Sequence, residues 1–199
     1  MSQKKLVHLL VFNGFADWEP AYAIAEINKS SKYQLVTVAF QQAPIVSMGG
    51  LRILPDIMIN QVNYHESELF ILPGGYMWEQ DSVDEIVPVV ENCRNNNVPV
   101  AAICGATLFL ANHGYLNNTP HTSNQLKYLK THSLNYRGDL YYQDTPCVTE
   151  NGFITANGAA SLEFTRAILD TLKIFDDNDL DQWYKVFKHG IHHWVVPEK

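Results

Sequence analysis

Three nearly continuous apolar runs dominate the first half of the chain, and each is stopped by a sequence that favours a turn. The runs are residues 6–12, 69–72 and 98–103, and they are stopped by Asn13-Gly14, Pro73-Gly74-Gly75 and Cys104-Gly105. A strand with one face in water alternates apolar and polar residues, whereas a strand covered on both faces does not. The runs therefore predict strands of a mostly parallel sheet buried between two layers of helices.

Segments with helical periodicity alternate with these strands. A helix is predicted over residues 20–28, because Pro20 suits the first helical turn and apolar residues recur at helical spacing. Further helices are predicted after Cys104-Gly105-Ala106, closed by His113-Gly114, and at residues 83–96, 125–130, 161–172 and 176–189. Further strands are predicted at 34–40, 140–148 and 152–156. Residues 44–59 predict a short hairpin or irregular β segment around Gly49-Gly50. We expect a single α/β domain over residues 1–199, with 176–199 as a C-terminal helical extension.

Composition limits what the chain is expected to bind. The formal charge at neutral pH is −7, and hydrophobic residues make up 46% of the 199 residues. A folded, acidic domain without a Lys/Arg cluster is not expected to bind nucleic acid. No apolar run approaches the ~18 residues of a membrane span, and three cysteines without a CxxC pair favour neither zinc nor a disulfide framework. The expectations are no nucleic-acid or membrane partner, no metal and a cytoplasmic location.

Cys104 lies at the corner between an apolar strand and a helical segment. Ala102 and Ala106 flank it two residues away, which leaves room for a sharp turn of the nucleophile-elbow kind. The N-terminus of a helix favours a thiolate over a thiol. The alternative is a buried structural cysteine, which is how we interpret Cys93 and Cys147 because neither lies at an elbow.

Three loops are expected to meet beyond the carboxyl ends of the strands, where parallel sheets bind ligands. They carry Glu19, Gly74-Gly75 and Cys104. The glycine turn and Gly105 could supply backbone N–H groups to an oxyanion, and Glu19 could carry a proton with a raised pKa beside a thiolate. The alternatives are an ordinary turn at the glycines and a solvated acid at Glu19.

Five motifs, in this order along the chain, resemble the ThiJ/PfpI family of the class I glutamine amidotransferase-like superfamily. They span roughly residues 6–172 and are Gly14 with Asp17-Trp18-Glu19-Pro20, Leu72-Pro73-Gly74-Gly75, Ala101-Ala102-Ile103-Cys104-Gly105-Ala106, His121-Thr122-Ser123-Asn124, and Asn157-Gly158-Ala159-Ala160-Ser161 with Glu163-Phe164. The resemblance implies a flavodoxin-like three-layer αβα sandwich, a reactive Cys104, an acidic partner at Glu19 and usually a homodimer.

Two departures from the family patterns bear on activity. Members of the intracellular peptidase type carry His directly after the nucleophile, where this chain has Gly105. Glutaminase members use a late His-x-Glu pair, which this chain lacks, so neither activity is supported. His121 is the predicted catalytic histidine, because it follows the elbow helix and enters a loop expected to return to the crevice. The alternative is a surface or supporting histidine.

These observations predict a cofactor-independent, cysteine-dependent hydrolase or hydratase acting on a small-molecule electrophile. Within the family the candidates include reactive dicarbonyls, glycated amines and isonitriles. Cys104 would attack the electrophile, Glu19 would carry and donate a proton, and Gly75 and Gly105 would stabilise the oxyanion. One alternative is a thiol-based redox or stress sensor without turnover, and another is a chaperone or assembly subunit that uses the aromatic C-terminal segment.

Overall fold

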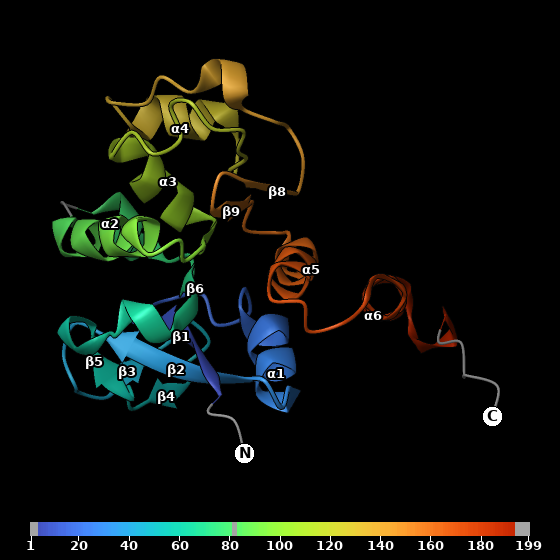
Figure 1. Ribbon diagram of the computed structural model, residues 1–199. Coiled ribbons are helices and arrows are strands. Elements are labelled where there is room, and N and C mark those ends of the chain that lie inside the picture. The colour runs from blue at the N-terminus through green and yellow to red at the C-terminus, as the bar shows by residue number, and fades with distance from the viewer. Residues whose placement is uncertain (1–3, 81–82, 194–199) are drawn as a thin grey trace, which may run out of the picture.

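The fold is organised around a mostly parallel sheet (Figure 1). The computed structural model describes residues 4–80 and 83–193, and within them seven strands lie in the order β5-β2-β1-β6-β7-β9-β8. Every neighbouring pair is parallel except β8 and β9. The strands are β1 (Lys5–Leu10), β2 (Tyr33–Ala39), β5 (Ile57–Met58), β6 (Ser67–Leu72), β7 (Val100–Ile103), β8 (Cys147–Glu150) and β9 (Phe153–Ala156). The predicted flavodoxin-like α/β fold is confirmed.

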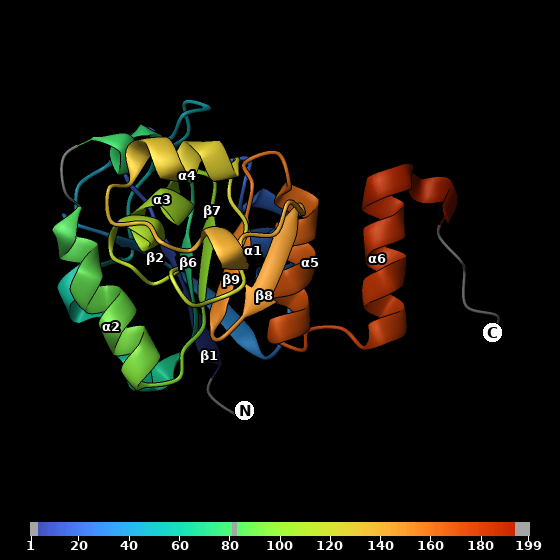
Figure 2. The same cartoon turned by 90° about the horizontal axis from the view of Figure 1, so that it is seen from above.

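Helices cover both faces of this sheet. Figure 2 shows α2, α3 and α4 on one side, and α1 and α5 on the other. The α-helices of the described residues are α1 (Ala21–Lys29), α2 (Val87–Asn95), α3 (Gly105–Asn112), α4 (Leu126–His132), α5 (Ser161–Thr171) and α6 (Asp177–His189). The two helical layers leave the central strands without a solvent face, which explains their continuous apolar sequences.

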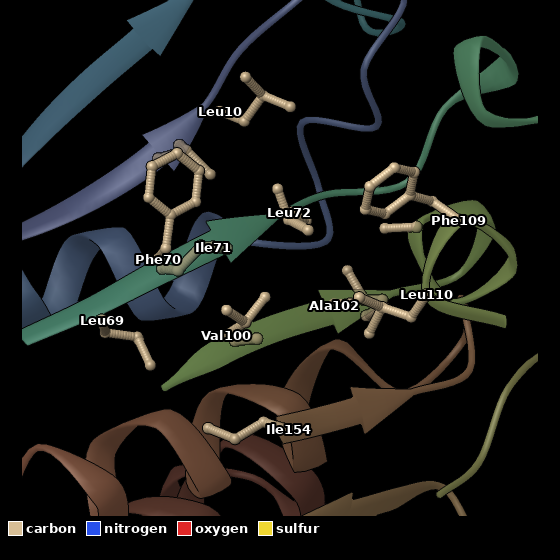
Figure 3. Close-up of a cluster of buried hydrophobic side chains, with 14 of the residues drawn as sticks. Leu10, Leu69, Phe70, Ile71, Leu72, Val100, Ala102, Phe109, Leu110 and Ile154 are labelled. Atoms are coloured by element: carbon tan, nitrogen blue, oxygen red, sulfur yellow. The ribbon is translucent and has the colours of Figure 1, made fainter. Parts of the chain in front are cut away.

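The core lies along β6 and β7. Residues 69–72 and 100–103 are all buried, with side chains at most 1% exposed. Figure 3 shows residues 69–72, Val100 and Ala102 in one cluster with Leu10, Ile154 and the α3 residue Phe109. Complete burial of one such aliphatic side chain stabilises the fold by roughly 1.5–3 kcal/mol. This packing fixes the ends of β6 and β7, from which two of the site loops start.

The segment 140–148 differs from the sequence prediction. Only Cys147–Glu150 forms a strand, β8, whereas Asp139–Tyr141 forms a 3-10 turn. Two backbone hydrogen bonds join this segment to His121, whose N–H donates to Tyr141 O and whose carbonyl accepts from Gln143 N. The prediction of a strand over 140–146 was wrong because a distant segment satisfies this backbone.

The region 44–59 forms the predicted hairpin and one additional strand. Strands β3 (Ile45–Val46) and β4 (Arg52–Ile53) pair antiparallel, while β5 joins the edge of the main sheet beside β2. Further along the chain, α5 begins with Ser161 as its first helical residue and with Ala160 as its N-cap, and the Ala160 side chain cannot cap.

The C-terminal helix α6 packs outside α5, away from the sheet (Figure 2). Leu180 and Trp183 form a small apolar cluster with Leu169 of α5. The rings of Trp183 and Phe187 meet the ring of Tyr22 on α1 edge-on. The helical part of the predicted extension therefore packs on the domain, while residues 194–199 lie outside the described residues. None of the helices in the described part of the chain combines the length and apolar character needed to cross a membrane.

Candidate active site

The strand order brings the three predicted loops to one edge of the sheet. β1, β6 and β7 are neighbours and run parallel, so their carboxyl ends lie side by side. The loop after β1 carries Glu19, the loop after β6 carries Gly74 and Gly75, and Cys104 follows directly after β7. The convergence that the sequence predicted is present in the structure.

Cys104 occupies a strained backbone conformation at this edge. Its φ is 58° and its ψ is −124°, outside the regions that ordinary residues favour. Such a conformation costs of order 1–3 kcal/mol and persists only when surrounding contacts hold it. The Cys104 N–H donates to Ala156 O at 3.0 Å, and its carbonyl accepts from Thr107 N at 3.1 Å. The elbow is thus held by β9 on one side and by α3 on the other.

A short hydroxyl chain reinforces the elbow. Thr107 Oγ1 donates to the Cys104 carbonyl at 2.6 Å, so its second hydrogen bond, to Ser123 Oγ at 2.6 Å, is one that it accepts. Ser123 lies in the segment between α3 and α4, and its side chain is buried. These two hydrogen bonds therefore join residues 121–124 to the turn that carries Cys104.

Glu19 and Cys104 meet at Gly74. The Glu19 side chain is 1% exposed, and its Oε2 accepts the Gly74 N–H at 2.5 Å. A Cβ added to Gly74 would lie 2.7 Å from Cys104 Cβ and 2.7 Å from Glu19 Oε2. Within the described residues Glu19 Oε1 has no hydrogen-bond partner, and the neighbouring Cys104 thiol acts to lower the pKa of the carboxyl. Only glycine allows the acid and the thiol to approach this closely.

Burial controls the protonation of this pair. It raises the pKa of the Glu19 carboxyl to about 7, against the opposing effects of the bonds from Gly74 and Cys104. Burial and the nearby Glu19 charge raise the pKa of the Cys104 thiol to about 11, although Asn124 and the Gly105 N–H act in the other direction. The predicted rise in the Glu19 pKa is confirmed in direction, but its cause is burial rather than the neighbouring thiol. The predicted lowering at Cys104 was wrong, because desolvation outweighs the helix N-terminus. At pH values between about 7 and about 11, the Glu19 carboxyl and the Cys104 thiol therefore hold one proton between them.

The glycines of the predicted oxyanion hole lie beside the thiol. The Gly105 N–H acts to lower the pKa of the Cys104 thiol, and a Cβ on Gly105 would lie 3.1 Å from Gly75 O. Gly75 has a φ of 150°, and a Cβ there would lie 2.7 Å from the ring of Phe12. Both positions therefore require glycine for close packing, and the role of their N–H groups toward an oxyanion stays a prediction.

His121 is buried away from the contacts of the thiol. Its Nδ1 bonds Thr119 O at 2.6 Å, and its Nε2 bonds the Tyr136 hydroxyl at 2.8 Å. Both ring nitrogens are therefore occupied by other groups, and burial lowers the pKa of the imidazole. The structure does not bring His121 to Cys104, and it supports the alternative interpretation of a supporting histidine.

Asn124 and Gly158 belong to the site, although sequence reasoning did not select them. Asn124 Nδ2 lies 3.4 Å from Cys104 Sγ, and a Cβ on Gly158 would lie 2.8 Å from that sulfur. Gly158 follows β9, which is the other neighbour of β7 in the sheet. Both residues lie in motifs that the sequence analysis quoted, but only the strand order shows that these loops reach the same edge.

Comparisons with known proteins agree with the fold and the motifs. The model of the DJ-1/PfpI family matches residues 5–171. The chain is 39% identical to "Uncharacterized protease YoaZ" of Bacillus subtilis over 94% of this chain and 92% of that protein. It is 28% identical to "Deglycase TK1284" of Thermococcus kodakarensis over 59% of this chain and 70% of that protein.

Solved structures give the same result at the level of the fold. A thiJ/pfpI family protein from Bacillus anthracis superposes with a TM-score of 0.86 at 38% identity, over 96% of this chain and 94% of the other. The DJ-1 superfamily protein Atu0886 from Agrobacterium tumefaciens gives 0.84 at 30% identity, over 92% and 97%. With this fold, these motifs and these relatives, the chain belongs to the DJ-1/PfpI family.

Proposed function

We propose that the protein is a cofactor-independent enzyme in which Cys104 attacks a small electrophile. The observation that carries the proposal is the contact between Cys104, half-buried at a strained elbow, and a buried acid that titrates near neutrality. Strain and a perturbed carboxyl at one place are typical of catalytic sites rather than of structural ones. The substrate class we propose is a reactive carbonyl, a glycated amine or an isonitrile.

The shared proton allows a balanced addition step. With a carbonyl substrate, the proton of the pair moves from the Cys104 thiol to the Glu19 carboxylate, and the resulting thiolate forms a C–S bond to the carbonyl carbon while the C=O electron pair moves onto oxygen. The carboxylic acid of Glu19 then donates its proton to that oxygen, which leaves a neutral hemithioacetal and an ionised Glu19. The carboxylate formed in this step can accept a proton later in the cycle, when water attacks or the adduct breaks down.

The surroundings of the sulfur favour a small substrate. Gly158 approaches so closely that a single added carbon would lie 2.8 Å from Sγ, and Gly74 is equally crowded. The exposed aromatic side chains Trp18 and Tyr76 neighbour the site loops and offer apolar contact area to a substrate. Relatives named deglycases are consistent with a carbonyl-derived substrate. Peptidase or glutaminase activity is not proposed, because the described contacts of Cys104 include Glu19, Asn124 and Gly105 but no histidine.

A panel of small electrophiles tests the proposal directly. Purified protein is incubated with methylglyoxal, a glycated amine and an isonitrile, and both substrate loss and adduct mass are followed. We expect at least one compound to be consumed catalytically, with any trapped adduct mapping to the peptide that contains Cys104. Consumption that matches the rate without protein, for every member of the panel, would count against an enzyme of this substrate class.

We also infer that the chain forms a homodimer through the β3–β4 hairpin. The hairpin is fixed to a site loop, because Asp17 accepts hydrogen bonds from Ser47 Oγ and Gly49 N–H, both at 3.0 Å. Large apolar side chains are exposed on and beside it, which marks an interaction surface; they are Trp18, Val46, Met48, Leu51, Leu54 and Tyr76.

Light scattering after size exclusion is expected to give twice the 22.6 kDa mass of the chain. Leu51→Glu places a charge on the proposed interface and is expected to shift the mass to that of one chain. Leu140→Glu is the matched control, since Leu140 is also exposed but lies outside the hairpin. A monomeric wild-type protein, or equal behaviour of the two variants, would contradict this interface.

A further inference from the structure

Asn124 makes two contacts that tie the thiol to the loop after β9. It lies two residues before the start of α4, with its Nδ2 3.4 Å from Cys104 Sγ. Its Oδ1 accepts the Gly158 N–H at 2.9 Å. One carboxamide therefore bridges the sulfur and the backbone of the loop that crowds it.

The Gly158 bond fixes which end of the carboxamide faces the sulfur. A backbone N–H can only donate, so the amide oxygen of Asn124 must point toward Gly158. The amide NH₂ group is then left facing Cys104 Sγ, where it can donate but cannot accept. A thiolate accepts hydrogen bonds better than a thiol does, so this arrangement stabilises the ionised sulfur over the protonated form.

Two titratable groups interact electrostatically with the sulfur, one from the loop after β1 and one from α4. Glu19 contributes its carboxyl from the loop after β1. Tyr128 lies on α4, and its hydroxyl donates to Glu79 Oε1 at 2.9 Å. The pKa of this phenol is raised by burial, by Glu79 and by the proximity of Cys104, so the phenol stays neutral. Asn124 itself neither gains nor loses a proton at neutral pH.

We propose that Asn124 is the positioning residue of the nucleophile, and that its oriented NH₂ group moves the shared proton from Cys104 toward Glu19. The proposal rests on the function proposed above, because it assigns to Asn124 the task of preparing the thiolate and the acid that the addition step consumes. The carboxamide cannot remove a proton from the substrate or from Cys104. Every proton that moves at neutral pH is therefore carried by the Cys104–Glu19 pair, and Asn124 determines where it rests.

The rate of Cys104 alkylation by iodoacetamide, measured against pH, tests this assignment without any substrate. Asn124→Ala removes the donor together with the Gly158 contact, whereas Asn124→Asp is nearly isosteric and keeps an acceptor for Gly158 N–H. Asp also places a negative charge beside the sulfur. Each unit of rise in the thiol pKa lowers the thiolate fraction tenfold, and the higher nucleophilicity of the more basic thiolate reduces this to roughly threefold in rate.

We expect alkylation at pH 8 to slow about threefold in Asn124→Ala and about tenfold in Asn124→Asp, with the midpoint of the profile moving to higher pH in the same order. Asn157→Ala is the matched control, because Asn157 Oδ1 accepts Ala159 N–H in the same loop without reaching the sulfur. This variant is expected to keep the wild-type profile.

The midpoint of the Asn124→Ala profile separates the proposal from a merely structural role, because this variant removes the donor without adding a charge beside the sulfur. If Asn124 only supports the Gly158 loop, Asn124→Ala will keep the wild-type midpoint, and a shift in Asn124→Asp alone then reports only its added charge; that result overturns the proposal. An unchanged midpoint in both variants overturns it as well. Since alkylation requires only the thiol, a failure of every electrophile in the turnover panel would leave this result intact, and the two failures can be told apart.

Discussion

Cys104→Ser is expected to reduce turnover by at least about 10³-fold on whichever electrophile the wild-type protein consumes. The serine hydroxyl fits the space of the thiol and leaves the backbone at φ 58° unchanged. Its proton, however, is far less acidic, and Glu19 is too weak a base to remove it. Loss of a nucleophile typically costs 10³-fold or more in kcat, with the residual rate coming from binding and oxyanion contacts.

Steady-state kinetics of Cys104→Ser should be compared with those of Cys147→Ser. Cys147 is also half-buried, but it lies on β8, and burial raises the pKa of its thiol to about 12. The Cys147→Ser variant is expected to keep the wild-type rate. Equal turnover by Cys104→Ser and the wild type would reject the enzyme and leave the redox sensor, whose readout is preferential oxidation of Cys104 by mild peroxide.

Glu19→Gln is expected to make the protein more stable at pH 8 while it reduces turnover. The glutamine side-chain oxygen can still accept a hydrogen bond from the Gly74 N–H, which in the wild type donates to Glu19 Oε2 at 2.5 Å. The Glu19 carboxyl differs from the glutamine carboxamide because only the carboxyl can ionise. Its pKa is about 7 in the fold against 4.5 as the ordinary value, because burial penalises the carboxylate.

The sign of the pH dependence follows from proton binding. Between pH 4.5 and pH 7 the unfolded chain has released the Glu19 proton while the folded protein still holds it. The unfolded state therefore binds fewer protons, and the free energy of unfolding falls as the pH rises through this window. The full loss above pH 7 is about 3 kcal/mol for a shift of this size. Below pH 4.5 both states are protonated and the penalty disappears.

Urea denaturation at several pH values measures this effect. We expect Glu19→Gln to exceed the wild type by about 1–3 kcal/mol at pH 8, with the difference shrinking toward pH 4.5. Glu26→Gln is the control, since Glu26 is a buried acid on α1 that forms an ion pair with Lys29 at 2.8 Å. That variant should lose stability rather than gain it. A difference between Glu19→Gln and wild type that is constant with pH would mean that Glu19 is not held neutral by the fold.

The two substitutions with the largest expected effects concern different members of the Cys104–Glu19 pair. Cys104→Ser removes the reacting atom and leaves the electrostatics of Glu19 in place. Glu19→Gln relieves the cost of a buried carboxylate and removes the proton donor. A protein that gains stability when an acid is removed has kept that acid for another reason, which is the trade-off expected of a catalytic group.

Much of the fold could be predicted from local sequence patterns. The continuous apolar runs at 6–12, 69–72 and 98–103 indicated strands covered on both faces, and all three lie in the centre of the sheet. The turn after each run also placed Glu19, Gly74 and Cys104 at the ends of strands. These features follow from the periodicity of side chains along a strand, which the sequence contains in full.

The proton chemistry and the remaining site residues depended on tertiary structure. The helix N-terminus alone predicted an acidic thiol, but burial and the Glu19 charge, which come from segments far apart in sequence, reverse that direction. His121 was expected at the crevice, yet Thr119 and Tyr136 hold its ring, and Asn124 reaches the sulfur instead. Local sequence determined which strands and turns form, because those depend on neighbouring residues. Only the packed structure decided which side chains share a dry, crowded space, because desolvation depends on everything that surrounds a group.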